Sequence, residues 1–134
     1  MPKNFVSAMD VFIGIAYYLP VGANSFHVSQ RLHEFFYEQK ATHPKTLGGI
    51  KFELSTKNPS SSRYTSPDLE AGISALSNTH AVTKFYRGHP SEYAFVPDTC
   101  KNFFERDIAH LLPETLEEIK DLARKFQREF TEKA

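Results

Sequence analysis

Hydrophobic residues recur every three or four positions near the start of the chain, over residues 5–19. This spacing places the apolar side chains on one face of a helix, which Pro20 ends. The stripe consists of Phe5, Met9, Phe12, Ile13, Ala16 and Tyr17. A second amphipathic helix is predicted over residues 24–40, because Asn24 and Ser25 are good N-cap residues.

Apolar and charged residues alternate over residues 50–54. The alternation predicts a short, half-buried strand with Ile50, Phe52 and Leu54 facing inward. The polar stretch from Thr56 to Ser62 predicts a loop.

Residues 65–68 carry the clearest local signal. A hydroxyl residue precedes Pro67 and Asp68, which are favoured in the first turn of a helix, and the helix continues to about Asn78. Two runs rich in strand-forming residues, 81–87 and 92–96, follow it. Together they predict a β-hairpin.

Two further helices are predicted at the end of the chain, one capped by residues 97–99 and one from Glu114 to about Lys133. The stripe of the last helix can pack onto the first two helices, or it can form a surface for a partner or a second copy. The residues assigned to that surface are Leu116, Ile119, Phe126 and Phe130. The fold class expected is therefore α+β, mostly helical, in one domain with a small antiparallel sheet that has residues 50–54 at its edge.

The order of these elements is similar to that of winged helix-turn-helix domains. The resemblance covers residues 5–96 and leaves 98–133 as a helical extension. It implies that 67–78 corresponds to the recognition helix and 87–91 to the tip of the wing. The family usually has its first strand after the first helix, whereas the strand predicted at 50–54 follows the second.

Composition adds an aromatic bias and a weak charge pattern. The chain contains 12 Phe and 6 Tyr, which favours a phenylalanine-rich core over an aromatic binding surface. Its formal net charge is zero, but residues 40–93 hold seven basic residues against four acidic ones, a net charge of +3. The residues assigned to contact with nucleic acid or another anionic partner are Lys51, Arg63, Lys84, Arg87 and His89.

Motifs of catalysis and cofactor binding are absent from the sequence. Cys100 follows a helix start, where a thiol can become reactive, but His110 is too far along the same helix to act as its base. A small thiol at the edge of the core is the favoured interpretation. No catalytic residue, metal site or cofactor is predicted.

The sequence therefore favours a non-enzymatic regulator or adaptor that uses a winged-helix-like domain for protein contact. A DNA-binding transcriptional regulator and an enzyme of unrecognised type remain as alternatives. A protein partner is expected, with a homodimer through the last helices or DNA as further options. A cytoplasmic location is expected, because one cysteine cannot form an internal disulfide and no apolar run reaches the length of a membrane span.

Overall fold

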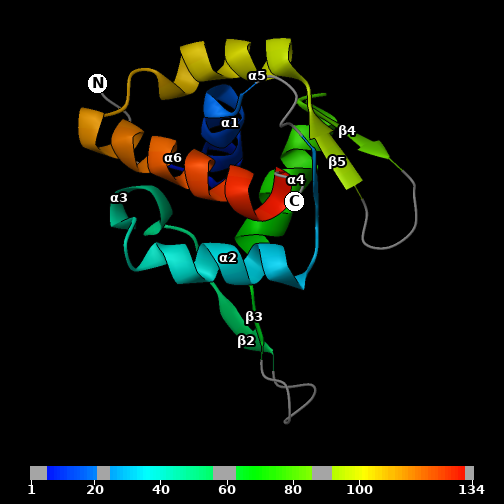
Figure 1. Cartoon of the computed structure of the whole chain (residues 1–134), viewed down its shortest axis with the longest axis vertical. Helices are drawn as coiled ribbons and strands as arrows, with labels where there is room; N and C mark the ends of the chain where they lie inside the picture. The colour runs from blue at the N-terminus through cyan, green and yellow to red at the C-terminus, as the bar shows by residue number, and fades with distance from the viewer. Residues whose placement is uncertain (1–5, 21–24, 56–62, 86–91, 132–134) are drawn as a thin grey trace.

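The computed structural model describes residues 6–20, 25–55, 63–85 and 92–131 and shows a mostly helical α+β fold with two small antiparallel sheets (Figure 1). The helices are α1 (Ala8–Tyr18), α2 (Gln30–Lys40), α3 (Pro44–Leu47), α4 (Pro67–Asn78), α5 (Pro97–Phe103) and α6 (Pro113–Phe126). The π-helical turns η1 (Phe104–Ile108) and η2 (Gln127–Thr131) extend α5 and α6. The strands are β1 (Ser25–His27), β2 (Glu53–Ser55), β3 (Arg63–Thr65), β4 (Val82–Phe85) and β5 (Glu92–Phe95).

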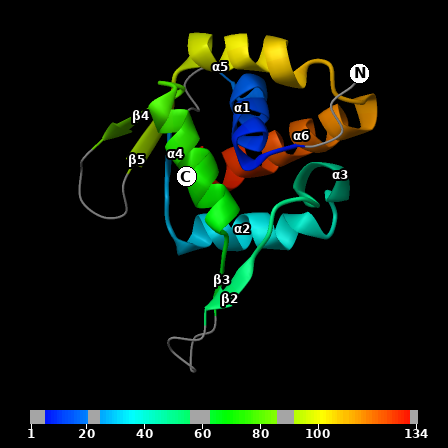
Figure 2. The same cartoon turned by 180° about the vertical axis from the view of Figure 1, so that it is seen from behind.

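The larger sheet has the strand order β1-β5-β4, with both pairings antiparallel. Phe26 of β1 lies opposite Tyr93 of β5, and both side chains are buried. The smaller sheet is the β2–β3 hairpin, which projects away from the body of the molecule beside α2 (Figures 1 and 2).

Helix α1 runs through the middle of the fold and contacts α4, α5 and α6. Ser7 and Asp10 form a capping box that fixes its first turn. Two glycines allow neighbouring helices to approach closely. A Cβ at Gly14 would lie 2.6 Å from Ile119 Cγ2 of α6, and a Cβ at Gly72 would lie 2.8 Å from the Cβ of Ala8.

The core is rich in phenylalanine, as the composition favours. Phe12 packs against Phe26 and Phe36, with ring centroids 5.9 and 5.4 Å away. Phe126 of α6 meets Phe26 edge to face at 5.6 Å, and all four rings are at most 1% exposed. Residues of the predicted C-terminal extension therefore share one core with the rest of the chain.

The helix predicted over 24–40 is wrong in its first part. Residues 25–27 form β1, and the helix begins at Gln30 with Ser29 as its N-cap. The physical reason is tertiary, because pairing with β5 satisfies the backbone of this segment and places Phe26 in the core.

The strand predicted over 50–54 is also partly wrong. Only residues 53–55 form a strand, and they pair with β3 and not with the 81–96 hairpin. Ile50 is buried, but Leu54 is 47% exposed because the hairpin leaves the body. The predicted hairpin is confirmed as β4 and β5, and its turn, 86–91, lies outside the described residues, as does the loop predicted at 56–62.

Helix α4 is confirmed, with the Ser66 side chain accepting a hydrogen bond from the backbone N–H of Leu69. Helices α5 and α6 begin at Pro97 and Pro113, close to the predicted positions. The assignment of the α6 stripe to a partner surface is wrong for Ile119 and Phe126, which are fully buried within the chain. Leu116 and Phe130 are partly buried and pack against the same core.

Candidate interaction groove beside helix α4

The basic residues assigned to an anionic partner do not form one surface. Lys51, just before β2, and Lys84 of β4 are both exposed, but their hairpins leave the body in different directions (Figures 1 and 2). Arg63 belongs to β3, and its side chain is not described. Arg87 and His89 lie outside the described residues.

The outward side of α4 carries acidic and small residues. Glu70, Ala71, Ser74 and Asn78 are exposed, and the helix contains no lysine or arginine. Asp68 in its first turn accepts a hydrogen bond at 2.8 Å from the backbone N–H of Lys51. A phosphate that approached this end of α4 would therefore meet carboxylates.

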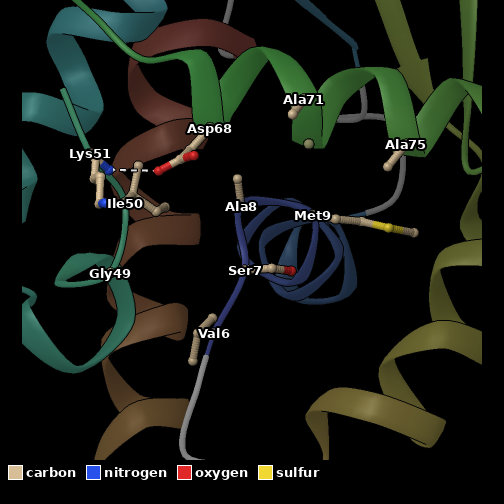
Figure 3. Close-up of a pocket in the computed structure, with 11 residues that line it drawn as sticks. Val6, Ser7, Ala8, Met9, Gly49, Ile50, Lys51, Asp68, Ala71 and Ala75 are labelled. Carbon is tan, nitrogen blue, oxygen red and sulfur yellow. Dashed lines mark hydrogen bonds between the residues drawn. The ribbon is translucent and has the colours of Figure 1, made fainter. Parts of the chain in front are cut away.

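A cavity of about 610 Å³ lies between α4, the start of α1 and the segment 49–51 (Figure 3). Ala71 and Ala75 project into it from α4, and Ala8 and Met9 border it from α1. The remaining lining residues are Val6, Ser7, Gly49, Ile50, Lys51, Asp68 and Gly72. We refer to this cavity as the α4 groove.

The walls of the α4 groove are fixed by local structure. The absence of a side chain at Gly72 lets α4 contact Ala8 at the floor of the groove. Ser7 caps α1, and Ser66 caps α4. Ser66 Oγ also donates a hydrogen bond to the Lys51 carbonyl at 2.6 Å, and this bond holds segment 49–51, which forms the third side of the groove, in place. The result is a surface recess with small apolar side chains in its middle and with Lys51 and Asp68 at its edge.

Apart from the α4 groove, a cluster of polar side chains joins the turn after α2 to α6. His43 is buried, and its Nε2 lies 2.7 Å from Asp121 Oδ2. Its Nδ1 lies 2.9 Å from the Thr42 hydroxyl and 3.0 Å from the Gln39 carbonyl. Hydrogen bonds to Arg124, His43 and Lys125 hold the pKa of Asp121 well below its ordinary value, against the opposing effect of burial.

This cluster resembles a nucleophilic triad in its order of groups. The hydroxyl is that of Thr42, the imidazole is that of His43, and the carboxylate is that of Asp121. The backbone N–H groups of Lys45 and Thr46 at the start of α3 could polarise a carbonyl, but the Glu118 carboxylate accepts from both. None of these residues lines the α4 groove. The arrangement is best explained as a structural connection between α3 and α6.

Cys100 is a buried thiol, as the sequence favours. It is 1% exposed, and its Sγ lies 3.4 Å from the Ala81 carbonyl oxygen. Burial raises its pKa to about 11. Such a thiol is not a nucleophile at neutral pH. Among the residues that the structure describes, no group of three or more His, Cys, Asp or Glu side chains could hold a metal ion.

Comparison of the chain with protein-family models, with curated proteins and with solved structures gives no match. Within the described part of the chain, no helix is both long and apolar enough to cross a membrane.

Sequence reasoning missed both the α4 groove and the His43–Asp121 pair. The groove is built from small residues of three segments that are far apart in the chain, and it has no linear motif. His43 and Asp121 are 78 positions apart. A signal was present for α3, since Pro44 follows His43 and proline is favoured in the first turn of a helix.

Proposed function

We propose that this protein is a non-enzymatic adaptor or regulator whose winged-helix-like domain binds a protein partner through the α4 groove. The observation that carries the proposal is the groove itself, an apolar recess between the start of α1 and the helix that would be the recognition helix. Apolar recesses with a few polar groups at the edge are typical of binding sites.

The topology supports the winged-helix resemblance. Strand β1 lies between α1 and α2, where the family usually has its first strand, and it pairs with β5 of the hairpin that follows α4. Helix α3 and the β2–β3 hairpin are then an insertion between the second and third helices of the motif.

Charge supports a protein partner over DNA. The outward side of α4 presents Glu70, and Asp68 borders the groove, whereas recognition helices approach a polyanion. The partner that fits is a segment with apolar side chains for the recess and a lysine or arginine beside them to face Asp68 and Glu70.

The test replaces Ala71 by a photoactivatable phenylalanine analogue in cells that make the protein. The proposal predicts one discrete crosslinked product, which a second change, Ala75→Arg, abolishes. The exposed neighbour Ser74→Arg serves as the matched control and leaves the product unchanged. The same analogue at Lys101, on the exposed side of α5, gives no product. No product at Ala71, or an equal one at Lys101, would overturn the proposal.

The DNA-binding alternative is tested by titration with mixed duplex DNA at two salt concentrations. Binding that weakens steeply with salt and is lost in Lys84→Ala/Arg87→Ala would favour a DNA-binding regulator, because phosphate contacts release counterions. The proposed function predicts no binding at low salt.

A further inference from the structure

His33 of α2 holds the junction between β3 and α4. The residue is 5% exposed, and its Nδ1 accepts a hydrogen bond at 3.0 Å from the backbone N–H of Ser66. An imidazole nitrogen that accepts from an N–H group carries no proton, so the proton of neutral His33 is on Nε2. The structure thus requires the neutral form of this ring.

His33 is the middle one of three α2 residues that hold the β3 end of the hairpin. One turn before it, Gln30 Nε2 donates to the Tyr64 carbonyl at 2.8 Å. One turn after it, the ring of Tyr37 stacks on the ring of Tyr64, with centroids 3.8 Å apart. Of these three contacts, only the one made by His33 changes between neutral and mildly acidic pH.

The charged group that faces His33 is the Glu70 carboxylate of α4, 3.8 Å from Nε2. Burial lowers the pKa of His33, and the negative charge of Glu70 opposes this effect in part. Glu70 is 68% exposed, so water screens its charge. The nearby Asp68 carboxylate accepts a hydrogen bond from the Lys51 N–H.

We infer that His33 is an acid-sensitive latch whose protonation at Nδ1 releases the Ser66 N–H and loosens the β2–β3 hairpin from α2. Protonation converts the acceptor into a donor, so two N–H groups then point at each other across 3.0 Å. It also places a positive charge in a buried site. Both costs are relieved when the junction at Ser66 opens.

The sign of the pH effect follows from the lowered pKa. The fold favours neutral His33, so the latch is fully closed above the pKa of a free histidine, about 6.5. It weakens as the pH falls below that value and is weakest below the pKa of His33 in the fold.

The latch also bears on the α4 groove, and this consequence rests on the proposed function. Ser66 Oγ donates to the Lys51 carbonyl, and the Lys51 N–H donates to Asp68 at the edge of the groove. Opening at Ser66 therefore loosens segment 49–51, which forms one side of the α4 groove. Acid pH should for this reason weaken binding of the partner.

The test measures hydrogen exchange of the Ser66 amide by NMR in the full chain at pH 7.5 and 5.0, after correction for the intrinsic exchange rate. The inference predicts at least a tenfold loss of protection at pH 5.0 for the wild-type protein, while Ile13 in α1 and Leu122 in α6 stay protected. In His33→Asn the amide oxygen can accept from Ser66 without titrating. Protection of Ser66 in this variant is then the same at both pH values.

The matched control is His27→Asn, which removes an exposed histidine and should behave like the wild-type protein. A second variant, Glu70→Gln, lies on the surface and tests the latch if His33→Asn does not fold. Loss of the facing negative charge lowers the pKa of His33 in the closed state further, so Ser66 should lose more protection at pH 5.0 than in the wild-type protein.

Three results would overturn the inference. They are an unchanged Ser66 protection in the wild-type protein, equal loss at Ser66, Ile13 and Leu122, or a Ser66 protection at pH 5.0 that Glu70→Gln leaves unchanged. None of these readouts depends on a partner, so failure of the latch and failure of the proposed function are distinguishable.

Discussion

His43 Nε2 lies 2.7 Å from Asp121 Oδ2, and this hydrogen bond joins the turn after α2 to the middle of α6. Asp121 also receives hydrogen bonds or ion pairs from Arg124 and Lys125, which follow it on the same helix. One carboxylate thus links a buried imidazole with the exposed Arg124 and the half-buried Lys125.

Asp121→Asn should lower the free energy of unfolding at pH 7 by about 1 kcal/mol, since the carboxylate is partly exposed and its pairs are screened. The lowered pKa of Asp121 stabilises the wild-type fold above the ordinary aspartate value of 3.8. This stabilising contribution is lost as the pH falls below 3.8, toward the lowered pKa of Asp121 in the fold. Urea unfolding at pH 7, 5 and 3 should therefore show a smaller gap between variant and wild type at pH 3. A constant gap would contradict this account, and Glu117→Gln, which removes an exposed pair with Lys120, serves as the control.

Gly14→Ala should destabilise the protein by about 1–3 kcal/mol, because the added Cβ would lie 2.6 Å from Ile119 Cγ2. The three nearest atoms all belong to the Ile119 side chain. In an Ile119→Ala background the same change should be neutral or stabilising, since alanine favours a helix over glycine by about 1 kcal/mol. A double-mutant cycle from urea denaturation measures the difference. An equal loss of stability in both backgrounds would show that the contact with Ile119 is not the reason why Gly14→Ala is unfavourable.

Cys100 should not react with a thiol reagent in the native protein at pH 8, because its pKa is about 11 and its side chain is buried. Labelling with a chromogenic disulfide should be complete only after denaturant is added. A Cys100→Ser/Ser74→Cys variant carries a thiol at an exposed position of α4 and should react within minutes. Rapid reaction of Cys100 in the native state would restore the reactive-thiol interpretation.

Glu118→Ala should loosen α3, because its carboxylate accepts hydrogen bonds from the backbone N–H groups of Thr46 at 2.9 Å and Lys45 at 3.4 Å. We expect a loss of about 1 kcal/mol, as for removal of a helix cap. Amide protection of Leu47 should fall more than that of Ile73 in α4. The exposed Glu117→Ala is the control and should change stability by less than about 0.5 kcal/mol.

Thr46→Val should stabilise the protein. Among the described residues, the Thr46 hydroxyl is buried without a hydrogen-bond partner. Valine has nearly the same shape and removes the cost of an unpaired buried polar group, which is about 1 kcal/mol or more. Thr79→Val is the opposite case, because the Thr79 hydroxyl donates to the Ala75 carbonyl at 2.8 Å. Thermal unfolding should show a higher Tm for the first variant and an unchanged or lower Tm for the second.

The parts of the fold that sequence reasoning predicted correctly carry strong local signals. Helix α4 has a hydroxyl cap, a proline in its first turn and a clear apolar stripe. The stripes of α1 and α6 are equally regular, and β4 and β5 are rich in strand-forming residues. Each of these signals lies within the element that it predicts.

The parts that it missed depend on distant residues. The apolar spacing of α2 continues back to Val28, and Asn24 and Ser25 are good N-cap residues, so the local signals extend the helix into β1. Only the pairing of residues 25–27 with β5 makes that segment a strand. A three-residue strand is too short for its own alternation to be visible.

The candidate site shows the same division. The helix dipole accounts for acidic residues in the first turns of α6, and the exposed Glu114 and Glu117 agree with that. Glu118 and Asp121 instead bind the segment around α3, and nothing within α6 distinguishes them from their neighbours. Likewise, small residues such as Ala71 and Ala75 border a groove only because α1 and segment 49–51 lie beside them.

The pairing of β1 with β5 and the packing of α6 on α1 also set when the protein can fold during synthesis. The partner of the first strand, and two of the helices that pack on the first helix, come from the last third of the chain. A ribosome-bound chain that ends before Glu92 leaves β1 without β5, and one that ends before Pro113 leaves Phe26 and Phe36 without Phe126. Folding is therefore expected to complete only after α6 has left the exit tunnel, and until then the exposed phenylalanines make the nascent chain a substrate for chaperones that bind apolar segments.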